Sequence, residues 1–296
     1  MIKRSNRVDF TTVFRERSMK PRRNWRALFV ATGLVATSMA LVSAPAFSTR
    51  TSELYGHAGE STVQSPSASL PVGTILPVRL DKTLAADEAQ AGQEIEGEIM
   101  QDVPLQDREK IHANSRVSGT IVSVAQAAGG AGTQVSLRFD KIDNHGEIIS
   151  MLTRLRAIAS DDVVNSALQP LNSGNDGSPS GWASTALIGG DVRYGDGGEV
   201  LNRQKQKVGK GVSGGVLVHV TAQPGSGCDG PINGDDSAQA LWVFSSDACG
   251  VYGLPGIEVP HDGKTAPFGV ITLKFEGSKT KLEALAGMLL RVVPSQ

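Results

Sequence analysis

The chain has 296 residues, of which 34 are glycine and only 5% are aromatic. This length allows one large β domain or two modest ones, and the composition favours short strands and turns over long helices. The formal charge of −1 hides an asymmetry, because residues 1–46 hold nine basic and two acidic residues and leave 20 basic and 28 acidic residues beyond them. A surface this acidic repels phosphate backbones, so we expect no nucleic-acid partner.

The N-terminal segment has the layout of a secretory signal. Basic residues at positions 20–26 precede the largely apolar run 27–42, and Ala44-Pro45-Ala46 matches an Ala-x-Ala cleavage site. We therefore predict a signal peptide over residues 1–46, with Met19 as an alternative start. The competing interpretation is an uncleaved inner-membrane anchor over residues 27–47, since about 20 apolar residues span a bilayer. Membrane contact is then made through this segment alone.

Residues 47–70 are rich in Ser, Thr, Gly and Pro. Such a composition buries too little apolar surface to offset the entropy of ordering, so we predict a disordered, flexible linker. The region 71–160 then alternates apolar and polar residues between turn-forming sequences. Strands are expected at 75–80, 94–100, 116–124, 133–141 and 147–158. Short consecutive strands of this kind predict a small antiparallel barrel or sandwich.

A second linker is expected over residues 161–190, which include a polar, Gly-rich stretch at 172–181. Beyond it, residues 191–296 predict a second β region, so the fold class is mainly β throughout. Its strands are expected at 216–222, 240–244, 257–259, 270–275 and 288–293, with a short helical turn over 279–286.

Cys228 and Cys249 are the two cysteines of the chain. Because export places them in an oxidising compartment, we predict a disulfide bond. The bond closes a loop of about 20 residues and stabilises the fold by about 3 kcal/mol on the chain-entropy model. A metal site with His219 and His261, or a redox pair, would be the alternative, but the close Cys-x-x-Cys spacing is missing. We therefore expect no metal and no cofactor.

Catalytic residue types occur in the second region without a catalytic pattern. Ser245, Ser246, Asp247 and His261 could supply a serine hydrolase, but the sequence lacks a Gly-x-Ser-x-Gly elbow, and a Ser-Ser-Asp turn commonly ends a strand. We therefore predict that the protein is not an enzyme. Several aspartates among glycines could bind calcium but lack the spacing of a calcium loop, which favours acidic turns; they are Asp191, Asp196, Asp229, Asp235 and Asp236.

Aromatic side chains gather beside the expected disulfide. Trp242 and Phe244 share one face of the predicted strand 240–244, which favours core packing against the disulfide. Trp242 and Tyr252 are also candidate residues of a recognition surface for a peptide or a glycan.

Two segments resemble known families. Leu70-Pro71-Val72-Gly73-Thr74-Ile75, Ala91-Gly92-Gln93, Gln101-Asp102-Val103-Pro104-Leu105 and Ser115-Arg116-Val117-Ser118-Gly119 follow one another in the chain. With them, residues 70–159 resemble the C-terminal β-barrel domain of the TrbI-like scaffold proteins of conjugation and type IV secretion channels. Where that family has Ile-Pro-Ala-Gly-Ser, this chain has Ile111-His112-Ala113-Asn114-Ser115. The resemblance implies a barrel fold and a place in a secretion channel.

Residues 216–293 resemble a C-terminal module of exported bacterial proteins of unknown function. Cys228-Asp229-Gly230 and the run from Gln239 to Gly253 carry this resemblance, which implies no activity. The favoured hypothesis is a periplasmic or secreted two-domain protein that binds or scaffolds an envelope protein or glycan without turnover. The alternatives are a channel subunit and a cryptic hydrolase centred on Ser245 and His261.

Overall fold

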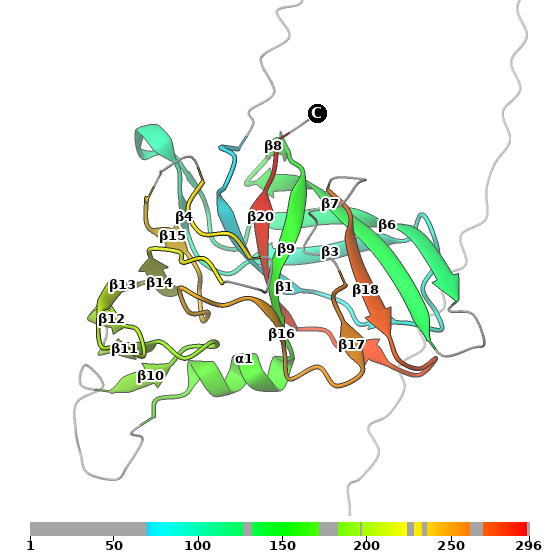
Figure 1. Cartoon of the computed structure of the whole chain (residues 1–296). Helices are drawn as coiled ribbons and strands as arrows, with labels where there is room; N and C mark the ends of the chain where they lie inside the picture. Colours follow the sequence, from blue (N-terminus) through cyan, green and yellow to red (C-terminus); the bar gives the residue numbers. More distant parts are fainter. Residues whose placement is uncertain are drawn as a thin grey trace, which may run out of the picture. The chain divides into compact units, whose positions relative to one another are not determined.

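The computed structural model describes residues 70–126, 132–171, 183–195, 197–223, 228–232, 236–260 and 269–294. The predicted signal peptide and almost all of the predicted linker 47–70 lie outside these residues. The described chain is mainly β, as predicted, and forms a nearly closed, barrel-like sheet and a second, six-stranded sheet (Figure 1). All described residues belong to one compact unit, Ser61–Gln296.

The barrel-like sheet has ten strands in the order β16-β9-β20-β1-β3-β6-β7-β18-β17, with β8 paired to β7. Its strands are β1 (Ile75–Leu80), β3 (Glu94–Ile99), β6 (Arg116–Gln126), β7 (Thr133–Asn144), β8 (Glu147–Ser150), β9 (Thr153–Ala159), β16 (Gly250–Tyr252), β17 (Ile257–Glu258), β18 (Ile271–Phe275) and β20 (Gly287–Val292). Neighbouring strands are antiparallel except β16 and β9, which are parallel.

The second sheet is an antiparallel meander at the lower left of Figure 1, beside the helix α1 (Asp161–Leu168). Its strands are β10 (Ser184–Ala186), β11 (Val192–Tyr194), β12 (Glu199–Leu201), β13 (Lys207–Val212), β14 (Gly215–Val218) and β15 (Gln239–Ala240). Two small pairs complete the fold: β2 (Leu84–Ala85) with β19 (Lys281–Leu282), and β4 (Val103–Pro104) with β5 (Lys110–Ile111), the latter pair flanking the short 3-10 helix η1 (Gln106–Arg108).

Strands β9, β20 and β1 separate two apolar cores. Leu76 and Leu290 belong to the core enclosed by the barrel-like sheet, whereas their neighbours Ile75 and Leu289 pack with α1 and the second sheet. Successive side chains of a strand point to opposite faces, so a strand covered on both sides needs apolar residues at nearly every position. This explains why all six residues of β20 are buried.

The first turn of α1 and a glycine of β20 bring the helix close to the sheet. The Ser160 hydroxyl accepts a hydrogen bond from the Val163 amide at 3.3 Å and so caps the helix. A Cβ atom at Gly287 would lie 2.8 Å from Val164 Cγ2 and 3.1 Å from Trp242 Cζ3. Glycine at this position therefore allows the helix and the indole ring to pack directly on β20.

Strands from both predicted β regions pair in the same sheet. β20 lies between β1 and β9, which come from the region predicted at 71–160. The buried side chain of Gln101 also joins the two sheets: its Nε2 donates to the Val216 carbonyl at 2.9 Å, and its Oε1 accepts from the Trp242 amide at 2.8 Å. The predicted boundary at 161–190 is thus crossed by strand pairs and by buried hydrogen bonds.

Several local predictions differ from the structure. The predicted strand 240–244 is wrong beyond Ala240, because the chain turns at Trp242, whose φ of 54° is incompatible with a strand. The predicted helical turn over 279–286 is wrong as well, because β19 pairs there with β2. The expected linker 161–190 contains α1 and β10, since Val164 and Ala167 form a buried face on a capped helix.

Candidate functional site: a pocket beside the disulfide loop

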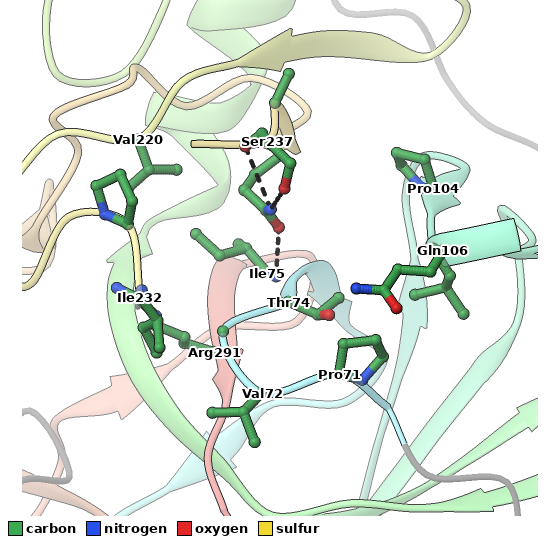
Figure 2. A pocket seen from close by; sticks show the side chains of 15 residues that line it. Pro71, Val72, Thr74, Ile75, Pro104, Gln106, Val220, Ile232, Ser237 and Arg291 are labelled. Atoms are coloured by element: carbon green, nitrogen blue, oxygen red, sulfur yellow. Dashed lines mark hydrogen bonds between the residues drawn. The ribbon is translucent and has the colours of Figure 1, made fainter. Parts of the chain in front are cut away.

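A cavity of about 260 Å³ opens between the start of β1 and the loops around the disulfide (Figure 2). Its walls come from four separate stretches, residues 71–75, 104–106, 231–232 and 237–239, with Val220 and Arg291 completing the lining. The lining combines apolar side chains with hydroxyl and amide groups, and among the described residues that line it Arg291 is the one that carries a charge. The pocket is therefore suited to an uncharged or weakly anionic group of small size.

Gln239 fixes one wall of this pocket. Its Oε1 accepts a hydrogen bond from the Ile75 amide at 3.1 Å, and its Nε2 lies 3.0 Å from the Ser237 hydroxyl (Figure 2). The entry to β1 is held on the other side, where the Gly73 amide donates to the Val292 carbonyl at 2.9 Å. On the opposite wall, the Gln106 side chain extends toward Thr74 in Figure 2. The backbone of the pocket is thus positioned by side chains from distant parts of the chain.

The predicted disulfide between Cys228 and Cys249 is confirmed, with the two Cα atoms 5.9 Å apart. It attaches the loop 228–232 to the segment that leads into β16. Pro231 and Ile232 of this loop line the pocket. The bond therefore restrains one wall of the pocket as well as the fold.

Three arginines of β9 and β20 bind the same loop. Arg291 donates to the carbonyls of Asp229 at 2.8 Å and Gly230 at 2.6 Å, while Arg154 forms a 2.7 Å ion pair with the Asp229 carboxylate. Arg156 donates to the Asp229 carbonyl and, at 2.9 Å, to that of Thr221. We call Arg154, Arg156 and Arg291 the arginine clamp. Sequence reasoning missed it, although an arginine inside an apolar run such as Leu-Arg-Ala or Leu-Arg-Val is a usable signal.

Burial disfavours the charged forms of two arginines of the clamp. Arg156 and Arg291 are only 3% and 2% exposed. Burial lowers the pKa of Arg156 to about 10, and the positive charges of Arg291 and Arg154 act in the same direction. Burial, and then Arg154, also lower the pKa of Arg291. Hydrogen bonds to backbone carbonyls keep these cations buried, so the loop and the clamp depend on each other.

The two serines considered for a serine hydrolase, Ser245 and Ser246, are buried. Ser245 is fully buried, and its Oγ accepts a hydrogen bond from the Asp191 amide at 2.8 Å. The Ser246 amide donates to Asp191 Oδ2 at 2.8 Å. Burial raises the pKa of Asp191, which is 1% exposed. His261 lies outside the described residues.

Three of the aspartates considered for calcium lie in the described residues, and each has a different partner. Asp191 accepts from Ser246, Asp229 pairs with Arg154, and Asp236 pairs with His219 at 3.5 Å. Asp196 and Asp235 lie outside the described residues. Within the described ranges, no three His, Cys, Asp or Glu side chains come together in a metal-binding arrangement.

The two aromatic residues proposed for recognition have different surroundings. Trp242 is 4% exposed and borders a second cavity, of about 200 Å³, together with Leu168 and Arg193. Tyr252 is partly buried, and its hydroxyl accepts a hydrogen bond from the Cys249 amide at 3.0 Å. Tyr252 therefore supports the disulfide, while Trp242 offers little side-chain surface to a partner.

Comparison with known proteins found no match to any family model and no similar curated protein. No helix in the described part of the chain is both long and apolar enough to span a membrane. The disulfide is typical of a protein that folds in an oxidising compartment outside the cytosol.

Proposed function

We propose that the protein is an exported, non-catalytic binding module of the cell envelope, in the periplasm or outside the cell, and that the pocket in Figure 2 holds a segment of a partner protein. The observation that carries this proposal is the pocket wall at Pro231 and Ile232, which one disulfide and three arginines hold in place. A preorganised wall lowers the entropy cost of binding and so favours a recognition role.

The chemistry of the lining favours a peptide over a glycan. Sugar rings are commonly recognised by aromatic side chains, and none of the described residues that line the pocket is aromatic. Three prolines, at positions 71, 104 and 231, lie with Val72 and Ile232 as apolar surface. Amide groups such as that of Gln106 can pair with the backbone of an extended segment. An extended peptide with one apolar anchor residue therefore suits this pocket.

The same lining supports binding without turnover. Ser237 is the one serine among the described lining residues, and its hydroxyl is engaged by Gln239. No histidine, aspartate or glutamate accompanies it in that set, so a general base for Ser237 is missing from the described lining. Turnover of a hydrolase or oxidoreductase substrate panel by the purified mature protein would contradict the proposal.

The test is site-specific crosslinking in cells that produce the protein. A photoreactive amino acid replaces Gln106 at the pocket, and in a matched control it replaces Ile148, which is 58% exposed and lies on β8. We expect a defined adduct from position 106, none from position 148, and loss of the adduct when Val72→Trp fills the pocket. The same adducts from both positions, or an adduct that survives Val72→Trp, would refute binding at this site.

A second candidate function is that of a subunit of a conjugation or type IV secretion channel. It is supported by the resemblance of residues 70–159 to TrbI-like scaffolds and by the barrel-like sheet. These residues contribute six of its ten strands, namely β1, β3, β6, β7, β8 and β9. Native electrophoresis of gently solubilised envelopes separates the two functions. A large ring-sized complex supports the channel role, whereas a complex of two chains supports the binding module.

A further inference from the structure

Two histidine rings meet at the surface, and neither of them lines the pocket described above. His112 follows β5 and His145 lies in the turn between β7 and β8, and their ring centroids are 4.9 Å apart with an angle of 43° between the ring planes. Stacked aromatic pairs are nearly parallel, and edge-to-face pairs are nearly perpendicular. This pair is neither, so ring stacking alone does not account for it.

The side chain of Asn144 fastens the two histidine-bearing segments together. Its Oδ1 accepts hydrogen bonds from the His112 amide at 3.0 Å and from the Ser115 hydroxyl at 2.9 Å. Its Nδ2 donates to the Lys110 carbonyl at 3.4 Å. Because His145 is the next residue in the chain, the same side chain fixes the distance between both histidines.

The backbone of His145 is held in a conformation that histidine rarely adopts. His145 and Gly146 have φ values of 58° and 100° and form the two-residue turn between β7 and β8. The Gly146 amide donates to Asp143 Oδ1 at 2.6 Å, which closes this turn. Turns of this kind favour Asn-Gly, so histidine at the first position costs stability that asparagine would not. An imidazole therefore stands at a turn position where asparagine would be more stable.

The separation of the rings matches that of two imidazoles on one metal ion. A zinc–nitrogen bond is about 2.0–2.1 Å, which places the ion about 3.2 Å from each ring centroid. At a tetrahedral angle, two such rings have centroids about 5 Å apart. The observed 4.9 Å agrees with this value.

We propose that His112 and His145 form a surface binding site for a divalent transition-metal ion of the zinc, nickel or copper class. Imidazole is a preferred ligand for these ions. Across the described ranges no third His, Cys, Asp or Glu joins the pair as a ligand, so water fills the other coordination positions and the ion exchanges with solvent. Beside His112, the Asp102 carboxylate accepts from the Ala113 amide at 2.9 Å and forms a 2.6 Å ion pair with Lys110. The metal site considered from the sequence involved His219 and His261 instead of this pair.

The test is calorimetric titration of Zn²⁺ and, separately, Ni²⁺ into the oxidised chain, purified without a histidine tag. His112→Phe keeps an aromatic ring but removes the ligand nitrogens, and His145→Asn suits the turn while removing the imidazole. His219→Asn is the matched control, because this half-exposed histidine pairs with Asp236 instead. Thermal melts without metal check that each variant is folded, and His145→Asn is expected to be at least as stable as the wild type.

We expect one saturable site in the micromolar range, at least tenfold weaker in His112→Phe and in His145→Asn and unchanged in His219→Asn. Absence of saturable binding in the wild type would overturn the proposal. Binding that survives either substitution in the pair, or that weakens equally in His219→Asn, would overturn it as well.

Discussion

Replacing Gln101 by leucine should lower the free energy of unfolding, because it removes the hydrogen bonds that this side chain makes between the two sheets. Gln101 is 1% exposed and is similar in size to leucine, so the substitution changes hydrogen bonding more than packing. The Trp242 amide loses the acceptor that it has 2.8 Å away, whereas the Val216 carbonyl keeps a hydrogen bond from the Leu241 amide at 3.2 Å. One buried N–H group is thus left unsatisfied, which costs about 2 kcal/mol.

Urea denaturation followed by circular dichroism measures this cost as a lower midpoint with an unchanged slope. Gln204→Leu, in an exposed turn, is the control and should shift the free energy of unfolding by less than about 0.5 kcal/mol. A Gln101→Leu protein as stable as the wild type would refute the reasoning. So would two separate unfolding transitions in the wild type, because the bonds of Gln101 would then not couple the sheets.

Gln101→Glu tests the same contact through pH. The carboxylate can still accept from Trp242, but it faces the Val216 carbonyl and is buried, so the pKa of the introduced group should be raised. A group with a raised pKa in the folded state loses its stabilising contribution as the pH rises through that value. The variant should therefore be close to the wild type near pH 5 and fall behind it toward about pH 8. A pH-independent difference would contradict this account.

Three further predictions concern the disulfide, the clamp and export. Replacing Cys228 and Cys249 by serine removes a crosslink between residues 21 positions apart. The free energy of unfolding, measured by urea denaturation, should fall by about 3 kcal/mol. A fall of less than about 1 kcal/mol would contradict the chain-entropy account. The pKa of Arg156 is lowered to about 10, so above that pH the folded protein binds fewer protons than the unfolded protein. The free energy of unfolding of the wild type should therefore rise relative to that of Arg156→Met as the pH rises from about 10, by up to about 1.4 kcal/mol per pH unit. The same difference between the two proteins in urea denaturation at pH 9 and at pH 11 would be inconsistent with this account. Mass spectrometry of the intact protein isolated from cells tests export. The chain should begin near Phe47, with both cysteines alkylated only after reduction, whereas a chain that retains residues 1–46 would support the membrane anchor.

Local sequence patterns were sufficient for much of the β structure. The predicted strand 75–80 coincides with β1, and the predicted strands 94–100 and 133–141 overlap β3 and β7. The run predicted at 147–158 is two strands, β8 and β9, because at Met151 and Leu152 the chain passes from pairing with β7 to pairing with β20. Alternation of side chains between two faces is local, so it can be recognised without knowing the partner strand.

The candidate site was much less predictable than the strands. Cys228 and Cys249 could be paired because they are two cysteines in a chain for which an export signal is predicted. Arg156 and Arg291 could not be connected to them, because their partners are backbone carbonyls, and every residue carries one. The sequence does not indicate which backbone carbonyl an arginine will bind. The arginine clamp and the pocket wall that it supports could therefore be identified only from the structure.

The sequence alone determined the mainly β class, the disulfide and the acidic character of the chain beyond residue 46, because composition and period-two patterns are properties of short segments. Only the tertiary structure decided that β20 lies between β1 and β9 and that His112 meets His145. Strand order and contacts between distant turns depend on how the whole chain closes, and many closures share the same local pattern. The pocket and the histidine pair are products of that closure.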